Sequence, residues 1–187
     1  MSKIPSQAKS VFKGEIFEVF QWEQELFDGT TRTFEMLKRP YSAEVIPVVN
    51  GQILLAEQEQ PGRGIFWSLF GGMVEPNESM LEAAKRELRE ESGYESTDWE
   101  LVFVDEPFFK MDYADHIYVA RKAELTTEPR LDGGEKITVH AVDFATFVEK
   151  ITSDTFRGSP AFKIAILKMR LAGPDAVTEF QKQLGAR

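Results

Sequence analysis

Alternating apolar and polar positions dominate the first 40 residues. Residues 11–40 carry β-prone side chains at every second place, and Asp28-Gly29 supplies a tight hairpin turn between them. We expect two or three antiparallel strands in residues 1–40, behind a loose tail of about ten residues. A strand-only stretch of this kind precedes a longer main domain in residues 41–187.

The main domain mixes strand and helix patterns. Asn50-Gly51 is a second tight turn signal, and residues 160–172 have a broad apolar side with helical periodicity. The predicted strands here are Ser42–Val49, Gln52–Glu57, Phe66–Phe70, Trp99–Val104, His116–Ala123 and Ile137–Val142. The predicted helices outside residues 72–94 are Phe144–Ile151, Pro160–Ala172 and a short final helix within Pro174–Arg187.

Residues 72–94 predict an amphipathic helix with clear ends. Pro76-Asn77 breaks the chain before it, and either Asn77 or Ser79 can cap its N-terminus. Gly93 stands where a left-handed residue ends a helix. The charged residues on the predicted solvent side, within roughly 60° of one another, are Glu82, Lys85 and Arg89.

Three carboxylates gather on the opposite side of this helix. Glu87, Glu90 and Glu91 fall within about a 100° arc, and like charges at this spacing repel unless a positive charge lies among them. Mg²⁺ or Mn²⁺ suits such oxygen ligands and keeps room for substrate phosphates. Gly71-Gly72 allows the backbone to approach a ligand or offer a carbonyl to a metal. A metal-dependent phosphate site is expected; the alternative is an ordinary charged surface helix.

The same stretch resembles the signature of the Nudix hydrolases. The matching positions are Gly72, Glu78, Arg86, Glu87, Leu88, Glu90, Glu91, Gly93 and Tyr94. Only Tyr94, where an aliphatic residue is commoner, is unusual. The resemblance implies the Nudix fold, an α/β/α sandwich with a mixed sheet, preceded here by an N-terminal antiparallel sheet. Nudix-like domains that keep this box but only bind a nucleotide sugar are the alternative.

The resemblance also implies roles for individual residues. The implied Mg²⁺ ligands, with Mn²⁺ as a substitute, are the carboxylates of Glu87, Glu90 and Glu91 and the carbonyl of Gly71. The implied catalytic residues are Glu90, Glu91, Glu135 and Arg86. Glu91 or Glu135 would take a proton from the attacking water, and Glu135 matches a loop glutamate that swings over the metal site. Arg86 and Glu78 would hold the helix and the loop in place by ion pairing.

Residues before the box resemble the ADP-ribose pyrophosphatase branch of this family. The matching residues are Gly14, Leu26–Gly29 and Glu35. The branch implies hydrolysis of a nucleoside diphosphate linked to a sugar, such as ADP-ribose to AMP and ribose 5-phosphate. The implied substrate-binding residues are Arg39, Arg63 and Gly72. Arg63 is displaced from the branch's usual position, so sugar nucleotides such as GDP-mannose remain competitors, and dinucleotides or capped RNA are further alternatives.

The branch further implies a homodimer paired through the N-terminal sheet. Uncovered, this sheet would expose Phe17, Phe20, Trp22 and Phe27, and a twofold mate would bury them. Arg39 could then contact substrate across the interface. The alternative is that these aromatics fold back on their own domain and Arg39 faces solvent.

Composition narrows the remaining classes. The 187 residues contain no cysteine, which excludes disulfides, thiolate metal sites and a cysteine nucleophile. The net charge of -9 disfavours a nucleic-acid groove. No apolar run approaches 18 residues, and the first ten lack a secretory signal, so no membrane partner and a cytoplasmic location are expected. A small nucleotide sugar is the expected ligand.

Overall fold

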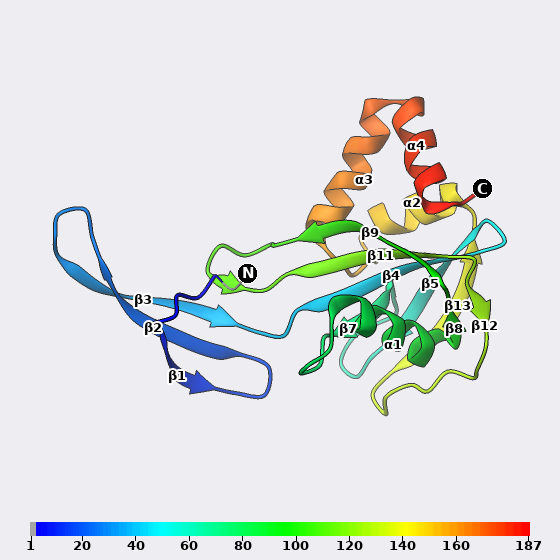
Figure 1. Ribbon diagram of the computed structural model, residues 1–187. Helices are drawn as coiled ribbons and strands as arrows, with labels where there is room; N and C mark the ends of the chain where they lie inside the picture. The colour runs from blue at the N-terminus through cyan, green and yellow to red at the C-terminus, as the bar shows by residue number, and fades with distance from the viewer. Residues whose placement is uncertain (1–2) are drawn as a thin grey trace.

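The computed structural model describes residues 3–187 and has a mixed α/β architecture (Figure 1). The strands are β1 Lys9–Lys13, β2 Glu18–Glu25, β3 Thr31–Lys38, β4 Ser42–Val49, β5 Gln52–Glu59, β6 Phe66–Ser68, β7 Phe70–Met73, β8 Tyr94–Glu95, β9 Asp98–Asp105, β10 Met111–Asp112, β11 Asp115–Arg121, β12 Glu124–Leu125 and β13 Lys136–Val142. The helices are α1 Met80–Ser92, α2 Phe144–Thr152, α3 Pro160–Ala172 and α4 Pro174–Leu184. All the helices predicted from the sequence are confirmed to within a few residues.

The central sheet has the order β13-β5-β4-β11-β9, with β6 joined to β5 and β7 joined to β4. Only β4 and β11 run parallel among these pairs, so the sheet is mixed, as the sequence predicts. Asn50 and Gly51 both have positive φ, 51° and 84°, which is the geometry of a tight two-residue hairpin. The turn joins β4 to β5 before the two strands diverge.

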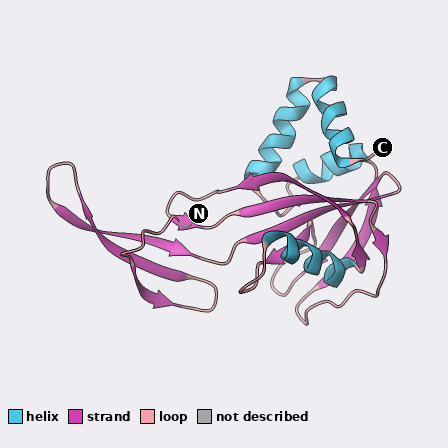
Figure 2. Ribbon diagram, in the orientation of Figure 1, coloured by secondary structure: helices cyan, strands magenta, loops and turns pink. Residues whose placement is uncertain are grey.

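Both faces of the sheet are covered by helices. Along β4, Ala43 and Val45 pack with α1, whereas Ile46 and Val48 point to the opposite face, where α2, α3 and α4 lie. Successive side chains of a strand point to opposite faces, so a strand that is apolar at nearly every position suits a sheet buried on both sides. Figure 2 shows the helices on the two sides of the sheet. The predicted α/β/α sandwich is confirmed.

The N-terminal sheet has the order β1-β2-β3-β10 and extends away from the sandwich (Figure 1). β2 and β3 pair antiparallel along their whole length around the turn that contains Gly29, whose φ is 79°. β10 is a parallel addition from residues 111–112, which the sequence pattern assigns to a loop. A strand of two residues is too short for alternation to reveal, so the fourth strand was missed.

Two further details differ from the predicted elements. Phe66–Phe70, predicted as one strand, divides at Leu69 into β6 and β7 because the two halves pair with different neighbours, β5 and β4. The short pair β8 and β12 was also missed. The division at Leu69 directs the chain toward Gly71 and the start of the box.

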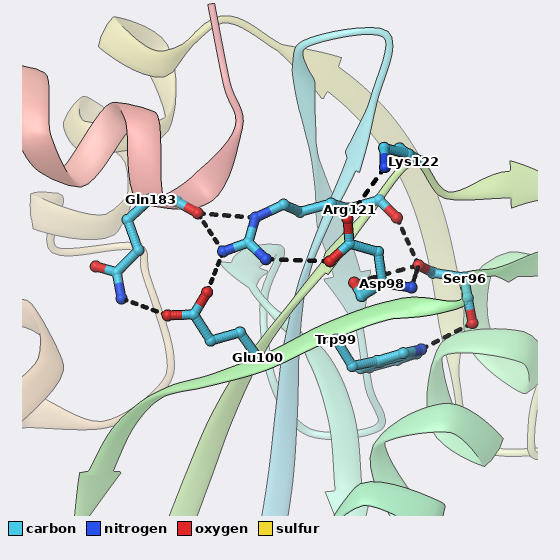
Figure 3. A network of polar contacts seen from close by, with 7 residues as sticks. All are labelled: Ser96, Asp98, Trp99, Glu100, Arg121, Lys122 and Gln183. Atoms are coloured by element: carbon cyan, nitrogen blue, oxygen red, sulfur yellow. Dashed lines mark hydrogen bonds and ion pairs between the residues drawn. The ribbon is translucent and has the colours of Figure 1, made fainter.

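An arginine network fastens α4 to the sheet on the side away from the box (Figure 3). The Arg121 guanidinium donates to Asp98 at 3.2 Å, to Glu100, and to the backbone oxygen of Gln183 in α4 at 2.9 Å. The Gln183 amide in turn donates to Glu100 at 3.0 Å. These bonds fix the C-terminal helix to β9 and β11. Within residues 3–187, no helix is long and apolar enough to cross a membrane.

Candidate active site on the box helix

The ends of α1 are set by local chemistry. Ser79 caps the helix by accepting from the Glu82 backbone N–H, and the Glu82 carboxylate accepts from the Ser79 N–H in return, which is a complete capping box. Of the two caps considered from the sequence, Ser79 is the one used. Gly93 closes the helix in a left-handed conformation with φ 76°. Glu82, Lys85 and Arg89 are exposed, as predicted.

Arg86 is the hub of the box. Its Nε donates to Glu78 at 3.0 Å, and one terminal nitrogen donates to both Glu87 at 2.8 Å and Glu90 at 3.2 Å. The other terminal nitrogen donates to Glu78 and to the backbone oxygen of Met73, which ties the loop before the helix to the helix itself. The two predicted positioning residues, Arg86 and Glu78, therefore contact each other directly.

Glu91 is joined to the strand ahead of the box. This carboxylate is only 6% exposed, and its Oε2 accepts from the Gly71 N–H at 2.8 Å. Gly71 has φ 150°, and a side chain there would strike the Ala43 backbone oxygen. A Cβ on Gly72 would lie 2.3 Å from an oxygen of Glu87. Gly71 therefore allows β7 to lie close against the backbone of β4, and Gly72 leaves room for the Glu87 carboxylate of α1.

The loop glutamate of the sequence prediction also reaches this region. Glu135 lies just before β13 and accepts a long hydrogen bond, 3.5 Å, from the side chain of Gln60. Burial and the nearby Asp132 raise the pKa of Glu135. The charge of Glu135 contributes to raising the pKa of both Glu87 and Glu91, so the loop brings it near the box acids.

The donor set of the box fits a divalent cation. Burial raises the pKa of Glu91 well above its usual range, and burial raises the pKa of Glu87 despite the opposing Arg86. A hard cation reverses such shifts by favouring the charged carboxylates, and oxygen donors are what Mg²⁺ prefers. In the part of the chain that the structure describes, no three acidic or histidine side chains already converge as a metal cage. Glu87 and Glu90 face Arg86 instead. The residues expected to hold such an ion are Glu87, Glu90, Glu91 and the carbonyl of Gly71.

A cavity of about 440 Å³ opens beside Gly71. Arg39 and Arg63, the two cations predicted to bind substrate, both line it. Arg39 is half-buried with its guanidinium 4.5 Å from the ring centre of Tyr113 in the same chain. The structure thus places Arg39 in a cavity of its own chain. Arg39, Arg63 and Gly71 line this cavity together. The box carboxylates are not among its lining residues and contact Gly71 and Gly72 from the other side.

Sequence reasoning missed several residues of this cavity. Asp105, Asp115 and Glu44 line one wall, and Arg157 adds a third cation above the Phe66 ring at 5.7 Å. Burial, with Asp105 nearby, raises the pKa of Asp115 from its ordinary value near 3.8 to about 7. Single acids at strand ends have no spacing pattern, but Glu44 within an otherwise apolar strand was a usable signal.

The chain is similar in sequence to several known proteins. The ADP-ribose pyrophosphatase of Bacillus subtilis (strain 168) is 25% identical over 171 residues, covering 88% of this chain and 91% of that protein. The ADP compounds hydrolase NudE of Escherichia coli (strain K12) is 31% identical over 94 residues, 48% of this chain and 50% of that protein. The methanol dehydrogenase activator of Bacillus methanolicus is 30% identical over 119 residues, 62% of this chain and 64% of that protein.

A solved structure described as the crystal structure of an ADP compounds hydrolase superposes on this fold with a TM-score of 0.68. The match covers 90% of this chain and 93% of that one at 20% sequence identity, so it bears on the fold alone. A family model described as the NUDIX domain matches residues 38–161, well over half of the chain. The chain therefore belongs to the Nudix hydrolase superfamily.

Proposed function

We propose that the chain hydrolyses the pyrophosphate bond of a nucleoside diphosphate linked to a sugar. The observation that carries the proposal is the junction at Gly71, which binds Glu91 through its N–H and also lines the 440 Å³ cavity. The acidic box and a cavity large enough for a ligand therefore meet at Gly71. ADP-ribose, giving AMP and ribose 5-phosphate, is the first candidate because a relative that matches most of the chain is named as an ADP-ribose pyrophosphatase. GDP-mannose is a related candidate.

Nudix enzymes typically use divalent metal ions, and here the proposed ion is Mg²⁺, with Mn²⁺ as a substitute. Glu87, Glu90, Glu91 and the Gly71 carbonyl would hold this ion, which would neutralise phosphate charge and lower the pKa of a water. The protein's part is to hold these carboxylates in place. Arg86 does so by holding two of them and the preceding loop at once.

In the proposed reaction, a water oxygen forms a bond to one phosphorus of the diphosphate and the bridging P–O bond breaks. The water's proton passes to a carboxylate, and the products are two phosphate monoesters. Glu135 suits the proton-accepting role because it is half-buried and lies on a loop beside the box acids. Among residues 3–187, its carboxylate receives only the long bond from Gln60. Glu91, in contrast, is held by the Gly71 N–H.

The arginines of the cavity supply the proposed substrate contacts. Arg63 and Arg157 are exposed at its rim, so their guanidinium groups are free to approach phosphate oxygens. Arg39, stacked on Tyr113, presents a planar cation deeper in the cavity. These cations offset the acidic wall opposite them.

The N-terminal sheet supports a further proposal, that two chains pair through it. The sheet stands away from the sandwich, and Phe12, Phe17 and Phe27 are more than 40% exposed. Apolar side chains beside open strand edges favour association with a second sheet. Light scattering at micromolar concentration should give a dimer mass, and Phe12→Ser with Phe17→Ser should reduce it. A monomeric wild-type protein would refute this pairing.

A substrate panel tests the proposed reaction. Nucleoside diphosphate sugars, a dinucleotide and capped RNA are incubated with Mg²⁺, and phosphate monoesters are detected. The sugar nucleotides should be turned over fastest, and reaction in ¹⁸O-labelled water should place one label in one of the two monoesters. Binding of a nucleotide sugar without turnover would instead favour a binding domain, and preference for capped RNA would contradict the assigned substrate class.

A further inference from the structure

A second group of acids lies in the cavity wall, apart from the box. Glu44 belongs to β4, Asp115 begins β11, and Asp105 ends β9, and these three strands are neighbours in the sheet. β4 and β11 run parallel and β9 runs opposite, so the start of the first two meets the end of the third. Asp115 lies opposite Asp105 in the strand pairing and close to Glu44, so the three acids gather at one end of these strands.

The polar groups here are not all satisfied. Asp105 accepts from the hydroxyl of Ser159, which caps α3. Asp115 is only 4% exposed and its Oδ1 has no hydrogen-bond partner among the described residues, and the same holds for the buried Oε2 of Glu44. The Nε of Arg39, which lines the same cavity, is likewise buried without a partner. Buried polar groups are rarely left unpaired, so three in one cavity indicate a ligand that pairs with them.

The chemistry of these groups restricts that ligand. Two carboxyl oxygens accept hydrogen bonds, so they suit a neutral, donor-rich part of the ligand. The guanidinium of Arg39 lies close enough to favour the charged form of Asp115, and its Nε can donate to an oxygen of the same group. Vicinal hydroxyls supply two donors and also oxygens that accept.

The position of Glu44 indicates which part of a nucleotide sugar lies there. Glu44 pairs in register with Gly71, the residue that joins the cavity to the box. A diphosphate bound at the box would therefore pass beside Glu44, and the groups next along such a ligand are sugar hydroxyls. The base of the nucleotide is separated from the diphosphate by the ribose ring.

We propose that Glu44, Asp115 and Arg39 form a subsite that binds vicinal hydroxyls of a sugar attached to the diphosphate. The proposal rests on the proposed function, because it takes a nucleotide sugar as the ligand of this cavity. Asp115 and Glu44 accept from the two hydroxyls, and Arg39 donates to one hydroxyl oxygen. The subsite would make affinity depend on these hydroxyls and not on the diphosphate alone.

Binding, not turnover, is the measurement that tests it. Dissociation constants are measured by calorimetry with Mg²⁺ for the α,β-methylene analogue of ADP-ribose, which is not hydrolysed. Two further analogues locate the hydroxyls: one lacks both hydroxyls on the adenosine ribose, and one carries a methyl group in place of the second sugar. The wild type should bind one of these at least about 10-fold more weakly than the parent analogue.

Asp115→Ala should remove most of this dependence, so that its affinities for the parent and the weaker analogue differ by less than about threefold. Asp115→Asn, which keeps one acceptor oxygen and the size of the side chain, should retain part of it. Glu100→Gln, a carboxylate change in the distant Arg121 network, should behave as the wild type. Circular dichroism checks that each variant folds.

Equal discrimination in the wild type and both Asp115 variants would overturn the subsite, as would a wild type that binds all three analogues alike or none. Failure of the proposed function is distinguishable: hydroxyl-dependent binding without hydrolysis of authentic ADP-ribose supports the subsite and counts only against the proposed reaction.

Discussion

Arg86 and Arg121 each contact several carboxylates, and these carboxylate partners behave differently. The side chains of Arg86 and Arg121 are equally buried, each 20% exposed, and each contacts acids and a backbone oxygen. Hydrogen bonds from Gln183 and Arg121 lower the pKa of Glu100, whereas burial raises the pKa of Glu87 even beside Arg86. Within the Arg86 network, Arg86 lowers the pKa of Glu78 but does not offset the burial that raises the pKa of Glu87.

The balance of charge explains this difference. At the Arg121 end, Lys122 also pairs with Asp98 at 3.4 Å, so cations and acids are matched. At the Arg86 end one guanidinium contacts three carboxylates, and the buried Glu91 lies beyond them with only a backbone donor. A balanced network holds a helix in place, whereas a surplus of buried negative charge calls for a cation.

The largest expected effect is on turnover of the proposed substrate. Glu91→Gln should lower kcat by more than about 100-fold. Removing a carboxylate that binds the metal costs more activity than removing a residue that only contacts such a ligand. Glu100→Gln, the same change in the Arg121 network, should leave kcat within about twofold. Steady-state rates at saturating Mg²⁺ decide it, and near-normal turnover by Glu91→Gln would remove the box from the mechanism.

A smaller effect is expected from the hub arginine. Arg86→Lys keeps the charge but loses the planar fork that reaches Glu78, Glu87 and Glu90 at once. The Mg²⁺ concentration for half-maximal activity should rise by about 10- to 100-fold. The matched change, Arg121→Lys, should not alter that concentration, and an equal rise in both would show that the box arginine has no special role.

The stability of the fold, in contrast to its activity, should depend on the Arg121 network. Arg121→Ala removes the bonds that join Gln183 in α4 to Asp98 and Glu100, at a cost of roughly 1–3 kcal/mol. For a chain of this size the melting temperature should fall by roughly 2–10 °C. Its kcat at 20 °C should stay within about twofold of the wild type. An unchanged melting temperature would mean that α4 is held by its apolar contacts alone.

The smallest effect concerns the pH dependence of stability. Asp115 has a raised pKa, so its contribution is present below its ordinary value near 3.8 and is lost as the pH rises through about 7. Glu100 has a lowered pKa, so its contribution is present above its ordinary value near 4.5 and is lost on acidification. Melting curves from pH 4 to 8 should show a flatter decline in Asp115→Asn than in the wild type. Glu100→Gln should be less stable mainly at neutral pH, and parallel curves for all three proteins would count against both assignments.

Much of this arrangement could be predicted from the sequence because it depends on local spacing. The phase of Glu87, Glu90 and Glu91 along α1, the stop at Gly93 and the hairpin turns follow from helix and strand periodicity. The acids of the cavity wall could not be predicted in this way. Asp105 and Asp115 are brought together only by strand order, and no short-range pattern encodes which strands become neighbours.

The N-terminal sheet shows the same limit. Its antiparallel strands have a visible alternation and a turn, and two or three of them were predicted, although β1 begins at Lys9, within the residues assigned to a loose tail. β10 begins 73 positions after the end of β3 and joins this sheet only because Met111 pairs with Leu37. A strand of two residues has no periodicity to detect. Arg39 was assigned to substrate from its place in the chain, but its stacking on Tyr113 in the same subunit came only from the fold.

Binding of Mn²⁺ without nucleotide tests the central claim most directly. Electron paramagnetic resonance measures free Mn²⁺ during titration of the wild type, Glu91→Gln and Glu100→Gln at pH 8. The wild type and Glu100→Gln should bind Mn²⁺ saturably with similar affinity, and Glu91→Gln should bind at least about 10-fold more weakly. Equal binding by all three proteins would contradict the claim that the surplus of carboxylates around Arg86 is a metal site.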